Sequence, residues 1–261
     1  MHTEMLDVIP LWCFLPMLLV VCLLTLEVGY RLGKWRHSRA ADEKEAPVAA
    51  MVGSVLGLLA FILAFTFSMA ASRFDARRQA VLQEANAIGT TYLRSRLLPK
   101  PEGEEIGRLL VSYTELRTQK LTPESIGDLL VESERLQDEM WTKAVGAAEK
   151  NPGSIMTGLF LESLNQSIDL HSERVFFGLY SRIPLIIWLM LFGLVVLGMI
   201  SVGYQSGLAA TRRSPEMFVF IFAFSCVLYL IIDLDRAHEG LVQISQRAII
   251  DLYETMQITK H

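Results

Sequence analysis

The sequence of 261 residues is 52% hydrophobic and 20% charged, and its formal net charge is −4 at pH 7. An acidic balance without a long basic stripe argues against a nucleic-acid-binding protein. The apolar residues are gathered into a few long runs, which argues against a soluble protein and for an integral membrane protein.

Four apolar runs predict four transmembrane helices. They extend over Leu11–Leu26, Val48–Ser72, Ile183–Arg212 and Met217–Ile232. Two of them exceed the ~20 residues that a helix needs to cross a bilayer, and two are near the lower limit. The first run is preceded by acidic residues instead of the basic residues of a signal peptide, so we expect it to be a retained span. The spans form two pairs, within residues 1–72 and 183–235.

Residues 73–182 predict a helical domain outside the membrane, because they show helical periodicity and no strand alternation. Val81, Ala85, Ile88 and Tyr92 follow each other at spacings of three and four, on a helix continuous with the second span. Further helices are expected over residues 104–119, from Thr122-Pro123 to about Glu149, and from a Ser154 cap towards Arg182. The fold class is therefore an all-α membrane protein with a helical extramembrane domain between its second and third spans.

One face of the second span carries most of its hydroxyl groups, although Thr66 lies off this face. Steps of three or four residues place its members on one side of a helix. This serine–phenylalanine stripe consists of Ser54, Gly57, Phe61, Phe65, Ser68 and Ser72, and it continues to Asp75 and Gln79. Its serines can line a water-filled pore, and its two phenylalanines can form an apolar constriction that gates by dewetting. Close helix packing and lipid contact are the alternative explanation of the same residues.

Four charged residues are expected at the membrane edges: Arg73, Asp75, Asp233 and Asp235. An unpaired charge at such an edge is costly enough to need water or a partner. For the two acids after the fourth span we expect a structural or regulatory role, with Arg236 or, across a subunit interface, Arg73 as partners. Two solvated interfacial acids are the alternative. Residues 236–261 are expected to form a C-terminal tail.

The sequence offers no pattern of catalytic chemistry. His171 with Glu173, and His238 with Glu239, lack the spacing of a zinc site. No phosphate-binding glycine loop or nucleophile elbow occurs. We therefore expect neither an enzyme nor a metal site nor a cofactor.

Several motifs resemble those of bestrophin channels. "AFTFSMAASRFDARRQ" is similar to their second transmembrane helix, with Phe61 and Phe65 at the constriction positions and Arg73-Phe74 at an Arg–aromatic pair. "IDLDRAHEGLVQIS" resembles the acidic stretch after their fourth span, although Ala-His at 237–238 replaces a Pro-Phe pair. "SRIPL" resembles the proline-bearing start of their third helix. "EANAIGTTYLR" and "DLDR" resemble, more closely, the bacterial bestrophin-like membrane family of unknown function.

The resemblance implies a homo-oligomer, a pentamer in bestrophins, built around the second helices in the lipid bilayer. It implies conduction of inorganic ions, anions rather than cations. A continuous helix over residues 48–98 is roughly 75 Å long, far more than the ~30 Å hydrocarbon core. The surplus is expected to form the stem of a vestibule.

The membrane orientation can be inferred in two ways, which disagree. The basic loop over residues 33–47 lies inside by the positive-inside rule, which places both termini outside. The resemblance instead places the termini and the helical domain in the cytoplasm, at a bacterial inner membrane. We follow the resemblance, because the excess of basic residues in that loop is small.

An ion channel is one of two functions considered for this sequence. The other is a non-conducting membrane scaffold or sensor whose helical domain binds a partner. Ion flux through liposomes that contain only the purified protein separates these two functions.

Overall fold

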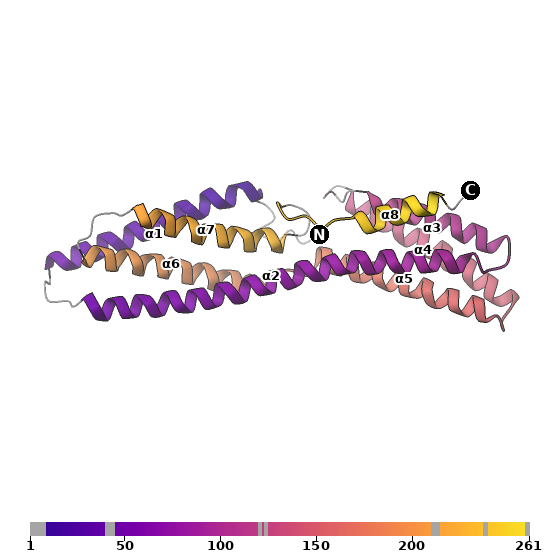
Figure 1. Ribbon diagram of the computed structural model, residues 1–261, viewed down its shortest axis with the longest axis horizontal. Coiled ribbons are helices and arrows are strands. Elements are labelled where there is room, and N and C mark those ends of the chain that lie inside the picture. Colours follow the sequence, from indigo (N-terminus) through magenta and orange to yellow (C-terminus); the bar gives the residue numbers. More distant parts are fainter. Residues whose placement is uncertain are drawn as a thin grey trace. The chain divides into compact units, whose positions relative to one another are not determined.

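The computed structural model describes residues 9–39, 45–119, 122, 125–209, 215–236 and 240–258. Within these ranges the chain forms eight α-helices and no β-strand (Figure 1). They are α1 (Leu11–Arg39), α2 (Glu45–Ser95), α3 (Glu102–Thr118), α4 (Ile126–Lys150), α5 (Ile155–Leu179), α6 (Leu185–Leu208), α7 (Pro215–Asp235) and α8 (Arg247–Ile258). Four of them, α1, α2, α6 and α7, are long and apolar enough to cross a membrane. The expected all-helical fold with four spans is confirmed.

The chain divides into two compact units. The first contains Met1–Arg73 and Arg182–Val242, and the second contains Phe74–Ser181 and Gln243–His261. The first unit holds α1, α6, α7 and the apolar part of α2, and the second holds α3, α4, α5, α8 and the rest of α2. The divisions lie at 73–74, 181–182 and 242–243, beside the domain boundaries expected at 72–73, 182–183 and 235–236. Helix α8, expected to belong to a tail, is part of the second unit.

In the first unit α1 packs against α6 and α7 (Figure 1). The contact between α1 and α6 is close because two glycine pairs face it. A Cβ atom built on Gly29 would lie 2.1 Å from the carbonyl oxygen of Ile200, and one on Gly203 would lie 2.1 Å from that of Leu26. Cβ atoms built on Gly33 and Gly207 would lie 2.1 Å and 2.3 Å from carbonyl oxygens of the opposite helix. In lipid, such small residues let helices approach and associate through van der Waals contact.

Helix α2 buries one face in the first unit. Val52, Leu59, Leu63, Thr66 and Ala70 are all buried, at spacings of three, four and seven residues. A Cβ atom on Gly198 of α6 would lie 3.2 Å from the Leu59 side chain, so this glycine also makes room for a neighbouring helix. The hydroxyl of Thr66 donates to the carbonyl oxygen of Ile62 at 2.8 Å, which satisfies it within its own helix.

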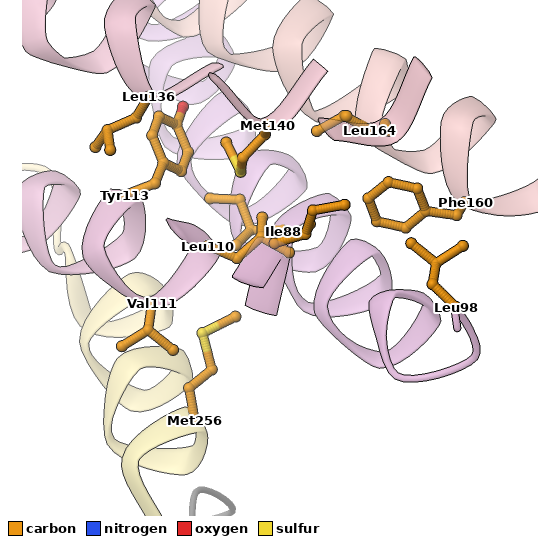
Figure 2. Close-up of a cluster of buried hydrophobic side chains, with 12 residues drawn as sticks. Ile88, Leu98, Leu110, Val111, Tyr113, Leu136, Met140, Phe160, Leu164 and Met256 are labelled. Atoms are coloured by element: carbon orange, nitrogen blue, oxygen red, sulfur yellow. The ribbon is translucent and has the colours of Figure 1, made fainter. Parts of the chain in front are cut away.

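The second unit encloses a hydrophobic core built from all of its helices (Figure 2). Ile88 of α2, Leu110 of α3, Met140 of α4 and Phe160 of α5 are each buried in it. Met256 of α8 is buried in the same core, where α8 packs against α3 (Figure 2). A short C-terminal helix thus contributes to a core that the sequence pattern assigned to residues 73–182 alone.

Local polar signals fix several helix ends. The Ser154 hydroxyl accepts a hydrogen bond from the Thr157 backbone N–H at 3.2 Å, so Ser154 is the N-cap of α5, as expected. Helix α4 begins at Ile126, later than the start expected at Thr122, whose hydroxyl accepts from the Ser125 N–H at 3.2 Å. Pro123 lies outside the described residues. Helix α1 continues to Arg39, so the first part of the expected basic loop is helical.

Candidate functional site

The serine–phenylalanine stripe occupies the uncovered face of α2. Every member, Ser54, Gly57, Phe61, Phe65, Ser68 and Ser72, is exposed in the single chain. Phe61 is 67% exposed and Phe65 is 55% exposed, although both are large apolar side chains. No other part of the described chain comes within 4 Å of a Cβ atom placed on Gly57. The stripe therefore lies outside the buried face of α2.

Residues beside the stripe differ in exposure. Leu63, which is not a member of the stripe, is buried. Leu58 is exposed and lies within about 20° of Phe65 around the helix axis, next to the stripe. Thr66, which weakened the pattern in the sequence, is fully buried on the opposite face.

The two charges expected at the mouth of the stripe point to different sides of α2. Asp75 is exposed, and Arg73 is half-buried. Residues two positions apart on a helix lie about 200° apart around its axis. Arg77, two positions after Asp75, is buried. The Asp75 carboxylate therefore belongs to the exposed face of α2, whereas the guanidinium groups of Arg73 and Arg77 do not.

The acids at the end of α7 are buried, with 1% exposure for Asp233 and 5% for Asp235. The carboxylate of Asp233 accepts hydrogen bonds from the backbone N–H groups of Leu241 at 2.8 Å and Val242 at 3.2 Å. Gly240 makes this turn possible, since its φ is +155° and a Cβ atom there would lie 2.2 Å from the Asp233 carboxylate. Asp233 thus fixes the turn that follows α7 and is not a solvated interfacial acid.

Hydrogen bonds to Asp235 connect the end of α7 to the residues just before α6. Its carboxylate accepts a hydrogen bond from the Ile183 N–H at 3.0 Å, and its carbonyl oxygen accepts one from the Arg182 guanidinium. Arg236 donates to the carbonyl oxygen of Ile9 at 2.6 Å and lies over the ring of Phe14, 5.1 Å from its centroid. These contacts give both acids a structural role. Ala237 and His238 lie outside the described residues.

A buried polar cluster lies in the second unit, centred on Glu84, which is 0% exposed. One carboxylate oxygen accepts from Arg117 Nε at 3.1 Å and from the Tyr113 hydroxyl at 3.2 Å. The other oxygen accepts from Arg174, which also donates to Gln246 at 2.8 Å. The Glu84 cluster therefore joins α2, α3 and α5 to the segment that leads into α8.

Two further side chains complete the Glu84 cluster. His171 Nδ1 lies 3.0 Å from the Tyr113 hydroxyl and 3.4 Å from the Glu84 carboxylate. The Gln137 amide donates to the same hydroxyl at 3.2 Å. The Tyr113 hydroxyl donates its proton to Glu84. A proton on Nδ1 of His171 can therefore be donated to the Tyr113 oxygen and to the Glu84 carboxylate, the two groups that this nitrogen contacts.

The electrostatics of the cluster favour an ionised Glu84. Burial alone would raise the pKa of Glu84, but Arg117, His171 and Arg174 together hold it well below its usual range. Glu84 lies twelve residues beyond the uncharged, membrane-crossing part of α2. Burial, with Glu84 next to it, raises the pKa of Tyr113 far above its usual value. Burial also lowers the pKa of Arg174, against the opposing effect of Glu84. The groups form a paired network, and among the described residues no cluster suited to a metal ion occurs.

A family model for the bestrophin-like domain matches residues 19–249. The chain belongs to the bestrophin-like family. Crystal structures of a bacterial bestrophin homologue from Klebsiella pneumoniae share the fold of this bestrophin-like protein. One, of a point mutant, has 17% identity and a TM-score of 0.68, over 93% of this chain and 97% of that chain. Another has 16% identity and a TM-score of 0.65, over 94% and 96%. A search of curated proteins found no significant match.

Family membership confirms the resemblance drawn from the sequence, and two of its motifs meet in this bestrophin-like chain. The Arg182-Ile183 pair of "SRIPL" contacts Asp235 of "DLDR". "EANAIGTTYLR" begins with Glu84, whose burial the sequence analysis missed. The spacing in the sequence does indicate this burial. Glu84 lies three residues after Val81 and four before Ile88, which places it on the apolar face of its helix.

Proposed function

We propose that this bestrophin-like protein is the subunit of a homo-oligomeric ion channel in which α2 lines the pore. Phe61 and Phe65 form the apolar constriction, and Ser54, Ser68 and Ser72 face the water-filled parts of the path. The expectation that such a channel conducts anions rests on the resemblance to bestrophins alone.

One observation carries this proposal: the two faces of α2 are used differently. The face with Leu59, Leu63 and Thr66 is buried against the chain's own helices, whereas the serine–phenylalanine stripe is exposed throughout. A face meant only for lipid gains nothing from three serines aligned on it, since hydroxyl groups prefer water or a partner. Polar groups and an apolar constriction on one uncovered face are features that a pore-lining helix can use.

A single stripe cannot enclose a path for ions, so the proposal requires several copies of the chain around one axis. A closed ring of identical subunits is the usual form of such an assembly. Five copies is the number implied by the resemblance. The mass of the purified protein in detergent measures the number directly, and a monomer under conditions that support flux contradicts the proposal.

The phenylalanines control conduction because an aromatic ring removes water from an ion and offers no polar replacement. Replacing Phe61 and Phe65 together by alanine widens and wets the narrowest part of the path. Alanine has the highest helix propensity, so α2 and the assembly are retained. We expect ion flux from liposomes to rise by about tenfold or more, which corresponds to a barrier lowered by roughly 1.4 kcal/mol.

The matched control is Phe67→Ala, because Phe67 is exposed and lies on a different side of α2 from Phe65. It removes the same side chain and should change the flux less than twofold. Equal flux in the double variant and the parent, with the oligomer intact, refutes the pore assignment. A larger effect of Phe67→Ala places the pore on another face.

The alternative, a scaffold or sensor that does not conduct, is favoured by exposed apolar side chains in the second unit. Leu93 of α2, Val131 of α4 and Ile155 of α5 are each more than 60% exposed. Such residues suit binding to another protein, and neighbouring copies of this chain can also cover them. Absence of flux across a range of pH, calcium concentration and voltage supports the scaffold.

The proposed location is a bacterial inner membrane, with the helical domain on the cytoplasmic side. The four apolar helices support the membrane location, and the resemblance supports the side. Single cysteines placed at exposed Glu149 of α4, in a variant without the three natural cysteines, test the side. Labelling by a membrane-impermeant thiol reagent in intact spheroplasts contradicts a cytoplasmic helical domain.

A further inference from the structure

The exposed face of α2 extends well beyond the serine–phenylalanine stripe. Steps of three or four residues continue it through Asp75, Gln79, Leu82, Asn86, Thr90, Leu93 and Leu97, and each of these is exposed. Asp75 is the single formally charged side chain in this register from Ser54 to Leu97. The formal charge carried by this register of α2 is therefore negative.

The basic residues next to Asp75 lie away from this face. Arg73 and Arg77 are two positions before and after it, which places each about 200° around the helix axis. Arg77 is buried and Arg73 half-buried. Arg78 is exposed, three positions on and so about 60° to the side of Asp75. Across the described part of the chain, no ion pair joins Asp75 to a basic group.

We propose that Asp75 determines the charge selectivity of the pore and makes this chain favour monovalent cations over anions. This preference is opposite to the one that the resemblance to bestrophins implies. The inference rests on the proposed function, because it assumes that the exposed face of α2 lines the path. In an oligomer each copy contributes one such carboxylate, at the level just beyond the last serine of the stripe. A ring of carboxylates is one of the arrangements by which cation channels select.

The position of this ring explains why it can select where the phenylalanines cannot. The rings of Phe61 and Phe65 carry no formal charge, so dehydration there opposes cations and anions alike. Asp75 lies ten residues beyond Phe65, roughly 15 Å along the helix axis. There ions still carry water, and the carboxylates raise the local concentration of cations and lower that of anions before the constriction is reached.

The test is the ratio of potassium to chloride permeability, measured from reversal potentials of the full-length protein in planar bilayers under a potassium chloride gradient. We expect a ratio above one for the parent. Asp75→Asn should lower it about five- to tenfold, because several weak attractions in a water-filled path add together. Asp75→Lys should invert the preference, and Asp75→Glu should retain that of the parent.

Two control variants change charge without changing this face. Glu149→Gln removes an exposed carboxylate from α4, and Arg78→Gln removes the exposed charge beside the stripe. Each should alter the ratio less than twofold. Raising the salt concentration should weaken the preference of the parent, since exposed charges are screened.

The outcomes separate this inference from the proposed function. A parent that conducts chloride in preference to potassium, or an Asp75→Asn variant with an unchanged ratio, overturns the role of Asp75 and leaves the channel intact. A parent that conducts no ions overturns the proposed function itself. A ratio that falls equally in Glu149→Gln assigns selectivity to the general negative charge of the chain and also overturns the role of Asp75.

Discussion

Replacing Glu84 by glutamine removes the negative charge from a fully buried site and leaves Arg117 and Arg174 there without it. Both guanidinium groups are at least nine-tenths buried, so water cannot take over their solvation. Breaking a buried ion pair by removing one partner typically costs about 3–5 kcal/mol. A natural domain is stable by only about 5–15 kcal/mol. We therefore expect the variant to lose a large part of the stability of its second unit.

The assay is thermal unfolding of the full-length protein in detergent, followed by backbone hydrogen exchange. The loss should appear as faster exchange in α3 and α5, which carry Arg117 and Arg174, and not in α1 or α6. Glu132→Gln is the control, because it breaks an exposed ion pair with Arg135 on α4. Such surface pairs contribute about 0–1 kcal/mol, so the control should unfold close to the parent.

The pH dependence of stability provides a second measurement of the same charge. The pKa of Glu84 is lower in the folded protein than the ordinary value of about 4.3. Its contribution is therefore complete above that ordinary value and is lost as the pH falls below it towards the folded pKa. The parent should lose stability more steeply than Glu84→Gln in this acid range. A loss below about 1 kcal/mol at neutral pH, or parallel acid profiles, refutes the role assigned to the cluster.

Three further predictions concern glycines and a helix cap. Gly203→Ala should lower the free energy of unfolding by about 1–3 kcal/mol, because its Cβ would lie 2.1 Å from a carbonyl oxygen of α1. The control Gly193→Ala places its Cβ in open space, so this variant should unfold like the parent. Gly240→Ala should cost about 1–3 kcal/mol and speed hydrogen exchange in the turn held by Asp233. Ser154→Ala should cost about 1 kcal/mol, with faster exchange confined to the first turn of α5. An unchanged melting temperature contradicts either glycine prediction, and unchanged exchange in α5 contradicts the capping role.

The sequence was sufficient for features that depend on local pattern. Length and apolarity alone predict the four spans, and the Ser154 cap follows from a polar residue ahead of an apolar helix. The uncovered stripe on α2 could be predicted because a helix fixes the angular position of every residue once its register is known. The same rule separates Asp75 from Arg73.

Features that depend on distant partners could not be predicted in this way. Glu84 meets Arg117 and Arg174 from positions 33 and 90 residues further along the chain. No spacing rule links those positions, because the packing of α3 and α5 decides which side chains meet. Asp233 was expected at a membrane edge, yet its burial depends on how residues 240–242 fold back onto it. Helix α8 was missed because its core contact comes from a few residues, among them Met256.

The glycine contact between α1 and α6 has a consequence for the synthesis of the protein. Gly29 and Gly203 are separated by about 170 residues, which a ribosome adds in roughly 9–35 s. During that time α1 must remain in the bilayer without the helix that later covers its glycines. Its backbone hydrogen bonds are satisfied within the helix, so lipid is an adequate temporary neighbour. The contact is therefore a late step of assembly, and substitutions such as Gly203→Ala should impair docking of α6 without preventing membrane insertion of α1.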